Sequence, residues 1–377
     1  MTRNPTYYFA YGSNLNLADW RQCCARNGRD PDSLRPVRRA WLPDHDLRFN
    51  YRSSSRGGGA LNVEPRPGQA VPGMIFEVDP DGWASLDRKE GAPTYYRPAT
   101  HTVLTEDGGA VEAIIYVVAP EKRVGFVAPT PEYVELVREG LQFFGYEDAQ
   151  QLYAAANDET PPPAVGGLFV YGTLRPGGSR FHLLLELGLQ TLEPMTVRGS
   201  RLVDLGSYPG LLPDSDGDVR GVRITASDPG RLLSRLDRVE GFVGWGCPGS
   251  LFARRLVAHG FDVAWTYAYV GDTELAQEIV GGDWLTHQGV DPAAIAEHLI
   301  AAFHKMPSDT LRATHNIPPS DNYREAWGGA DLLVTDNPVA PPEDDHWGRF
   351  DRCVRVETPH AEAVGRVLRL LWETPGM

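Results

Sequence analysis

The arrangement of apolar and polar positions predicts short strands and helices in two successive rounds. In the first round, the uncharged run Thr6–Tyr11 predicts a buried strand, and Gly12-Ser13-Asn14 predicts a turn that leads into a helix at Asn16–Ala25. Further along, the pattern predicts a strand at Val71–Val78, a helix at Pro80–Glu90 stopped by Gly91, strands at Tyr95–Val103 and Val111–Val118, and a helix from Pro129 to about Phe144. These elements indicate a small α+β domain.

One segment of the first half lacks the pattern of a strand or a helix. Asn50–Gly59 is rich in Ser, Arg and Gly and is too small and polar for a core, so it predicts a flexible loop beside the site. It lacks the glycine, lysine and hydroxyl spacing of a phosphate-binding loop.

The second round begins with a strand-like run at Leu168 and should end its sheet near Tyr267–Val270. After Asp283-Trp284 the repetition stops. The remaining residues predict a helix at Pro292–His304, a Pro-rich stretch around Pro338–Pro342, and a strand and helix between Cys353 and Leu371.

Three landmarks recur in the same order and mark the chain as a tandem. They are a Tyr-Gly turn (Tyr11-Gly12 and Tyr171-Gly172), a middle glycine (Gly73 and Gly221), and the hexapeptide Leu-Asp-Arg-x-Glu-Gly (Leu86–Gly91 and Leu236–Gly241). We therefore predict a first domain at 1–156, a Pro-rich linker at 157–167, a second domain at 168–287 and a C-terminal extension at 288–377.

Composition limits the partners. A formal net charge of −14 argues against nucleic acid or an anionic membrane, because both are bound through clustered Lys and Arg. Arginine supplies nearly all of the basic residues, and we attribute the scarcity of lysine to coding bias. No segment has the pattern of a secretory signal or of a membrane span, so we expect a cytoplasmic protein.

Cysteine and histidine offer weaker candidates for chemistry. The cysteines, Cys23, Cys24, Cys247 and Cys353, form neither a C-x-x-C pair nor a disulfide framework, which favours incidental thiols over a nucleophile. Histidines crowd the end of the chain from His287 onward, but none falls in a metal-binding spacing, so surface or capping roles are favoured over a metal site.

The repeated glutamates are stronger candidates. Glu90 and Glu240 each stand at a predicted helix end, where the carbonyl groups disfavour negative charge and raise the pKa of a carboxyl toward that of a useful base. A solvated helix end is the alternative for each glutamate. Each domain also has a turn whose backbone N–H groups can hold an oxyanion.

Together these motifs resemble the γ-glutamylcyclotransferase-like superfamily. Tyr11-Gly12-Ser13-Asn14-Leu15 and the Pro129–Tyr133 helix start resemble the γ-glutamylcyclotransferase branch, whereas Tyr171-Gly172-Thr173-Leu174 and Gly282-Asp283-Trp284 resemble the γ-glutamylamine cyclotransferase and AIG2-like branch. The resemblance implies two tandem domains, each a small mixed β-barrel with flanking helices.

The resemblance also implies a chemistry. In this superfamily the α-amine of a γ-glutamyl group attacks its own γ-carbonyl, which releases an amine and 5-oxoproline without a metal or other cofactor. Glu90 and Glu240 would then be the general acid and base. Substrate would be held by the turn residues of both domains and by three aromatic side chains: Tyr11, Gly12, Ser13, Asn14, Leu15, Tyr171, Gly172, Thr173 and Leu174, with Tyr96, Tyr116 and Tyr133.

Two interpretations stay open at this point. In the first, one or both domains release 5-oxoproline from a small-molecule or carrier-bound γ-glutamyl substrate. In the second, one or both domains are degenerate binding modules without turnover. The second copy departs from the pattern in a Gly- and Trp-containing insertion at Phe242–Ser250, and Phe252 stands where the first has Tyr96. For Tyr116, packing in the core is an equal alternative to a place in the pocket.

Overall fold

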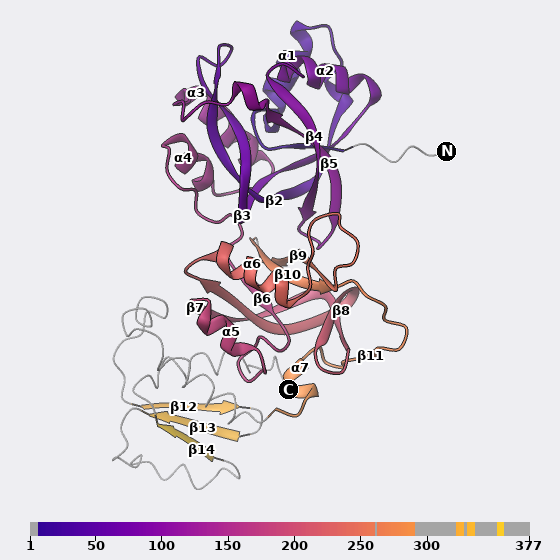
Figure 1. The fold of residues 1–377 in the computed structure, drawn as a ribbon, viewed down its shortest axis with the longest axis vertical. Helices are drawn as coiled ribbons and strands as arrows, with labels where there is room; N and C mark the ends of the chain where they lie inside the picture. The colour runs from indigo at the N-terminus through magenta and orange to yellow at the C-terminus, as the bar shows by residue number, and fades with distance from the viewer. Residues whose placement is uncertain (1–6, 261, 291–321, 328–329, 336–352, 358–377) are drawn as a thin grey trace. The chain divides into compact units, whose positions relative to one another are not determined.

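The computed structural model describes residues 7–260, 262–290, 322–327, 330–335 and 353–357. Two compact units make up the chain, the first mainly residues 1–166 and the second mainly the residues from 167 onward (Figure 1). In the described part of the chain, no helix is long and apolar enough to cross a membrane.

The first unit is a closed five-stranded barrel with the order β1-β3-β2-β4-β5. Its strands are β1 (Tyr7–Ala10), β2 (Leu34–Ser53), β3 (Gly58–Val78), β4 (Tyr96–Thr105) and β5 (Ala110–Val118). β1 pairs antiparallel with β3 and parallel with β5, so it has a hydrogen-bonded neighbour on each side. Phe9, Ile75 and Ile115 lie on the same face of these paired strands and are buried, which places the core directly before the turn after β1. Phe76 lies on the opposite face, against Tyr8 and Phe144.

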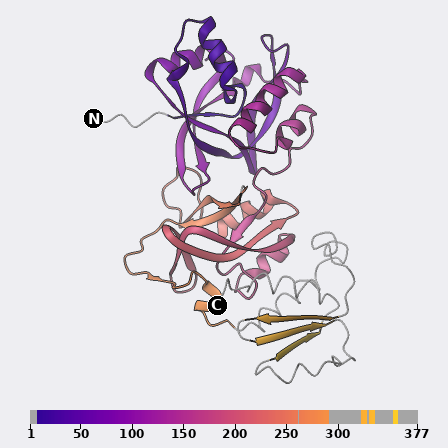
Figure 2. The same cartoon turned by 180° about the vertical axis from the view of Figure 1, so that it is seen from behind.

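The helices of this unit lie outside the barrel in both views (Figures 1 and 2). They are η1 (Ser13–Leu15), α1 (Leu17–Arg26), η2 (Pro31–Ser33), α2 (Pro80–Glu90), η3 (Pro120–Lys122), α3 (Pro131–Phe143) and α4 (Gln150–Ala156). The predicted helices are confirmed. Asn16 and Thr130 are the N-caps of α1 and α3, and Gly91 ends α2 in the left-handed conformation at φ 63°.

The prediction of a flexible loop at Asn50–Gly59 is wrong. Asn50–Ser53 ends β2, Gly58-Gly59 begins β3, and only residues 54–57 form the turn of this hairpin. The glycines are required by a close approach: the N–H of Gly59 donates to the carbonyl of Ala128 at 2.9 Å, and a Cβ on Gly59 would lie 2.0 Å from the carbonyl oxygen of Val127. The composition that resembled a loop therefore reflects backbone packed on backbone.

The second unit repeats the plan in a six-stranded sheet with the order β11-β7-β8-β6-β10-β9. Its strands are β6 (Leu168–Val170), β7 (Leu189–Asp204), β8 (Pro209–Ala226), β9 (Phe252–His259), β10 (Asp262–Tyr269) and β11 (Gln277–Glu278), and its helices are α5 (Phe181–Glu186), α6 (Pro229–Val239) and α7 (Trp284–His287). β6 lies between β8 and β10 just as β1 lies between β3 and β5. The sheet is not closed as the barrel of the first unit is.

The middle glycines of the two copies have the same role. A Cβ on Gly73 would lie 2.2 Å from the carbonyl oxygen of Ala10 and 2.5 Å from the ring of Phe9. A Cβ on Gly221 would lie 2.4 Å from the carbonyl oxygen of Val170 and 2.5 Å from the ring of Phe169. Only glycine allows the long strand to cross the first strand so closely. The predicted α+β class with two tandem domains is confirmed.

The Pro-rich segment predicted as a linker at 157–167 is packed against α4. Pro161 and Val165 are buried, and the carbonyl of Pro162 accepts a hydrogen bond from Gln151 at 2.9 Å.

Beyond the second unit, β12 (Asn322–Trp327), β13 (Ala330–Thr335) and β14 (Cys353–Glu357) form a three-stranded sheet, which includes the predicted strand at Cys353. The helices predicted at Pro292–His304 and toward Leu371 lie outside the described residues.

Candidate active site

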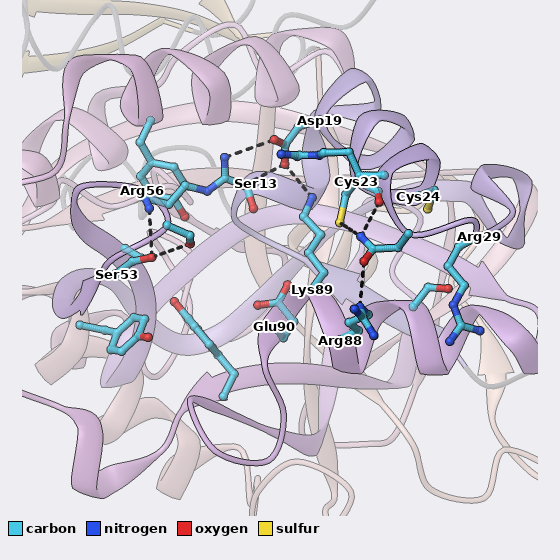
Figure 3. Close-up of a pocket in the computed structure, with 18 residues that line it drawn as sticks. Ser13, Asp19, Cys23, Cys24, Arg29, Ser53, Arg56, Arg88, Lys89 and Glu90 are labelled. Carbon is cyan, nitrogen blue, oxygen red and sulfur yellow. Dashed lines mark hydrogen bonds and ion pairs between the residues drawn. The ribbon is translucent and has the colours of Figure 1, made fainter.

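A pocket of about 480 Å³ opens in the first unit where α1, α2 and the β2–β3 hairpin meet (Figure 3). This volume is in the range of small-molecule sites. The residues that line it are Ser13, Asp19, Cys23, Cys24, Arg26, Asn27, Arg29, Tyr51, Ser53, Ser55, Arg56, Ala60, Ser85, Arg88, Lys89, Glu90, Tyr96 and Tyr133.

The repeated hexapeptide places Glu90 in this pocket. Leu86 is fully buried and anchors α2, while Gly91 takes the left-handed conformation that ends the helix, so the last residue of α2 faces the cavity. The pKa of Glu90 is raised above its ordinary value, as the sequence predicted, but the largest cause is burial of the carboxyl rather than the helix end. The positive charge of Lys89 opposes this rise.

Asn14 fixes the position of the Glu90 carboxylate. Its Nδ2 donates to Oε1 of Glu90 at 2.7 Å and to the hydroxyl of Tyr8 at 2.8 Å. Asn14 is itself almost completely buried in η1, against which α3 packs so closely that a Cβ on Gly140 would lie 2.6 Å from the carbonyl carbon of Leu15. The turn after β1 and the helix α3 thus hold the acid from one side.

The backbone of the turn is only partly available to a ligand. The N–H of Leu15 donates to the carbonyl of Gly12 at 3.0 Å, and the start of α1 is capped by the side chain of Asn16. Within the described residues, the N–H groups of Gly12, Ser13 and Asn14 have no hydrogen-bond acceptor, and Ser13 lines the pocket. Of the turn's predicted oxyanion-binding N–H groups, these three are available to a ligand and that of Leu15 is not.

The tyrosines divide into two sets. Tyr96 and Tyr133 line the pocket, and burial raises the pKa of Tyr133 to about 12, which keeps its phenol neutral. Tyr11 and Tyr116 lie outside the pocket lining: the hydroxyl of Tyr11 donates to the carbonyl of Tyr116 at 2.6 Å, and that of Tyr116 donates to Asp87 at 2.6 Å. These hydrogen bonds join the turn after β1 and the helix α2 to β5, so the packing interpretation of Tyr116 fits the structure better.

Sequence reasoning missed a buried ion cluster beside Glu90. Asp19 accepts hydrogen bonds from both terminal nitrogens of Arg56, at 3.2 and 2.9 Å, and pairs with Lys89 at 2.7 Å. Lys89 also lies over the ring of Trp20 and is 8% exposed. No local pattern indicated this cluster, because Arg56 and Lys89 lie 37 and 70 residues from Asp19 in the sequence.

The second unit holds the equivalent groups in a far smaller space. Glu240 follows α6 directly and lines a cavity of about 30 Å³, the space of one water molecule, together with Tyr171, Gly172, Thr173, Leu174 and Phe252. Pro209 approaches the turn so closely that a Cβ on Gly172 would lie 2.7 Å from it. The hydroxyl of Tyr171 donates to the carbonyl of Tyr267 at 2.7 Å, as that of Tyr11 does to Tyr116.

Two segments of the chain, residues 8–134 and 168–286, match the model of one family, described as gamma-glutamyl cyclotransferase, AIG2-like. The chain belongs to this family. The two matched segments hold the two Tyr-Gly turns and the two glutamates, so the family resemblance expected from the motifs is confirmed for both copies.

Three relatives each match less than half of the chain. The chain is similar to the gamma-glutamylcyclotransferase family protein YtfP of Escherichia coli K12, with 30% identity over 118 residues that cover 31% of this chain and 95% of YtfP. It is also similar to the gamma-glutamylcyclotransferase of Bos taurus, with 29% identity over 140 residues, 36% of this chain and 69% of the bovine protein. A solved gamma-glutamyl cyclotransferase is 24% identical and covers 42% of this chain and 89% of its own, with a TM-score of 0.34.

The buried carboxyl of Glu240 should make the stability of the second unit depend on pH. Burial raises the pKa of Glu240 from its ordinary 4.5 to about 7, opposed by the charge of Arg180. The folded state therefore binds this proton more tightly than the unfolded chain, and the stability of the second unit falls as pH rises from about 4.5 to 7. Glu240→Gln removes this cost and should stabilise the unit at pH 8 by about 2 kcal/mol, after allowance for partial exposure.

Urea unfolding read by hydrogen exchange in peptides of β7 and β8 measures this effect. The gain of the Gln variant should vanish below pH 4.5, where both states carry a neutral carboxyl. Equal stability of the two proteins at pH 8 would show that Glu240 is not desolvated.

Proposed function

We propose that the first unit is a γ-glutamyl cyclotransferase that releases 5-oxoproline from a γ-glutamyl amine. The observation that carries the proposal is a carboxylate with a raised pKa, Glu90, fixed by Asn14 in a pocket large enough for a small molecule. Family membership supports the same reaction class.

The reaction needs one proton carrier. An α-ammonium must lose a proton before its nitrogen can attack the γ-carbonyl carbon, and Glu90 is the base that accepts it. The nitrogen then forms the ring bond while N–H groups of the turn after β1 hold the oxyanion, and the bond to the leaving nitrogen breaks as Glu90 returns the proton to it. The second proton, left on the ring nitrogen, then passes through Glu90 to the released amine, which leaves as an ammonium ion. One substrate gives 5-oxoproline and one amine, and no water is consumed.

The pocket supplies the geometry that this cyclisation needs. A γ-glutamyl chain is flexible, and its amine reaches its own γ-carbonyl only when the chain is folded toward a ring. The rings of Tyr96 and Tyr133 stand against the cavity and are themselves fixed, since the hydroxyl of Tyr96 donates to the carbonyl of Leu61 at 2.8 Å and Tyr133 packs under Arg56. These walls favour the compact substrate conformation.

Turnover is assigned to the first unit alone, and the second is proposed to be a degenerate module. The cavity beside Glu240, about 30 Å³, has no space for a glutamyl group, although the pKa of about 7 would suit a general base. The difference in cavity volume supports this assignment, whereas the pKa of Glu240 alone would not.

The test is release of 5-oxoproline from a panel of γ-glutamyl amines, measured by mass spectrometry for the whole chain and for Glu240→Gln. We expect product from at least one amine and turnover within twofold of the parent in the variant. Absence of product from every amine would refute the activity. Loss of turnover in the Glu240 variant would instead refute the assignment to the first unit.

A further inference from the structure

The far wall of the pocket holds cations that the proposed reaction does not use. Arg26, Arg29 and Arg88, here called the arginine rim, line the cavity together with Asn27. Arg26 ends α1, Arg29 lies just beyond it, and Arg88 is a residue of α2 two positions before Glu90. Figure 3 shows Arg29 and Arg88 on one side of Glu90 and Arg56 on the other.

The rim carries charge that no carboxylate of the described residues neutralises. Arg56 and Lys89 are paired with Asp19, but no carboxylate oxygen of the described part lies within 4.0 Å of Arg26, Arg29 or Arg88. Because guanidinium groups stay protonated, the rim is a permanent positive surface at the pocket. In a chain with a net charge of −14, such a surface is needed to draw in an anion that the whole protein would otherwise repel.

Arg88 is held in a defined orientation. Its Nε donates to Oδ1 of Asn27 at 2.8 Å, and Nδ2 of Asn27 donates to the carbonyl of Cys23 at 2.7 Å. Anchoring through Nε leaves both terminal nitrogens of the guanidinium for a ligand, which is the fork that carboxylate and phosphate groups accept. Among the described residues, Arg26 donates a hydrogen bond only within its own helix, to the carbonyl of Gln22.

We infer that the arginine rim binds an anionic group, a carboxylate or a phosphate, on the amine that the first unit releases. This inference rests on the proposed function. The glutamyl end must reach Glu90 with both its α-amine and its scissile bond, so the leaving amine extends toward the pocket's other wall. A substrate with a negative charge two carbons beyond the scissile nitrogen would place it among cations, whereas a cationic amine would be repelled.

A matched series of substrates tests the inference. The γ-glutamyl amides of ethylamine, β-alanine, phosphoethanolamine and ethylenediamine share a two-carbon linker on the scissile nitrogen, which carries a hydrogen, carboxylate, phosphate or ammonium group. We expect kcat/KM for the carboxylate or the phosphate to exceed that for ethylamine at least tenfold, with ethylenediamine the poorest. The two anionic members show which anion the rim prefers.

Variants then assign the effect to the rim. Arg29→Gln and Arg88→Gln should each lower kcat/KM for the preferred anionic amide by about fivefold to thirtyfold and leave the ethylamine amide within twofold. Arg21→Gln is the matched control, because Arg21 is an exposed arginine of α1 that does not line the pocket. Arg29→Glu should raise kcat/KM for the ethylenediamine amide, a gain that misfolding cannot produce.

The outcomes separate this inference from the proposed function. Equal kcat/KM for all four amides, or an equal loss of kcat/KM on all four in the variants, would refute anion binding by the arginine rim. If no amide yields 5-oxoproline, the proposed function fails. Calorimetric titration of the same compounds then still shows whether the arginine rim binds the anionic group. Tighter binding of the anionic amides that Arg29→Gln and Arg88→Gln abolish supports it, and equal binding refutes it.

Discussion

Glu90→Gln is expected to fold like the parent protein and to lose turnover by about 10²- to 10⁴-fold, because the amide keeps the shape of the carboxyl but cannot accept the proton of the α-ammonium. The hydrogen bond from Nδ2 of Asn14 can be kept by the amide oxygen, so the pocket should not collapse. The measurement is the rate of 5-oxoproline release at saturating substrate, with thermal unfolding as the check on folding.

The pH profile gives this prediction a second readout. Glu90 must be ionised to act as a base, so kcat/KM of the parent should fall as pH drops through its pKa, which burial raises above the ordinary 4.5. The residual activity of Glu90→Gln should lack that acidic limb. Turnover retained at the parent's level by the folded variant would remove Glu90 from the mechanism, with Glu240→Gln as the matched substitution in the other copy.

Asp19→Ala is expected to destabilise the first unit by about 3 kcal/mol or more, because it leaves the buried ammonium of Lys89 without its carboxylate. Arg56 is more exposed, at 26%, and should suffer less from losing the same partner. Urea unfolding followed by hydrogen exchange in peptides of β1 and α1 resolves the first unit from the rest of the chain.

The control is the double variant Asp19→Ala with Lys89→Met. Removing both charges replaces an uncompensated cation by an apolar side chain of similar length, which should restore most of the lost stability. A double variant as unstable as Asp19→Ala alone would mean that Asp19 acts through Arg56 or through its negative charge in the first turn of α1. A neutral Asp19→Ala would mean that water already solvates Lys89.

The fold was predictable from the sequence where one residue type satisfies a local requirement. Gly91 and Gly241 end their helices at φ 63° and 65°, and Leu86 and Leu236 are fully buried, so the repeated hexapeptide is a helix end with a core anchor and an acid between them. The hairpin turn region was not predictable. Gly58 and Gly59 have loop composition, and their requirement for glycine comes from Val127 and Ala128, far along the chain.

The candidate site was predictable only in its motif residues. Glu90, Ser13, Tyr96 and Tyr133 line the pocket and were all singled out from the motifs. Glu90 ends α2, Ser13 begins η1 and Tyr96 begins β4, so element boundaries in the sequence indicated them. Asp19, Arg56 and Lys89 come from a helix, a hairpin turn and a second helix, and nothing local to any of them indicates the others. Long-range ion pairs of this kind are set by the tertiary fold.

The two copies also differ in a way that motifs do not show. Both carry a Tyr-Gly turn and a glutamate, yet the cavities measure about 480 and 30 Å³. The difference depends on neighbours such as Pro209, whose ring approaches Gly172, and Phe252, which fills the place of Tyr96 with side-chain contacts to Tyr208 and Tyr269. Equal motifs therefore do not imply equal sites.

The most direct test of the central claim is to follow the atoms of one γ-glutamyl amine in water enriched in ¹⁸O. Intramolecular attack by the α-amine predicts one 5-oxoproline for each amine released, with no ¹⁸O in the product, and loss of this reaction in Glu90→Gln. Glutamate carrying one ¹⁸O would show that water is the nucleophile and would contradict the account, as would 5-oxoproline release that Glu90→Gln leaves unchanged.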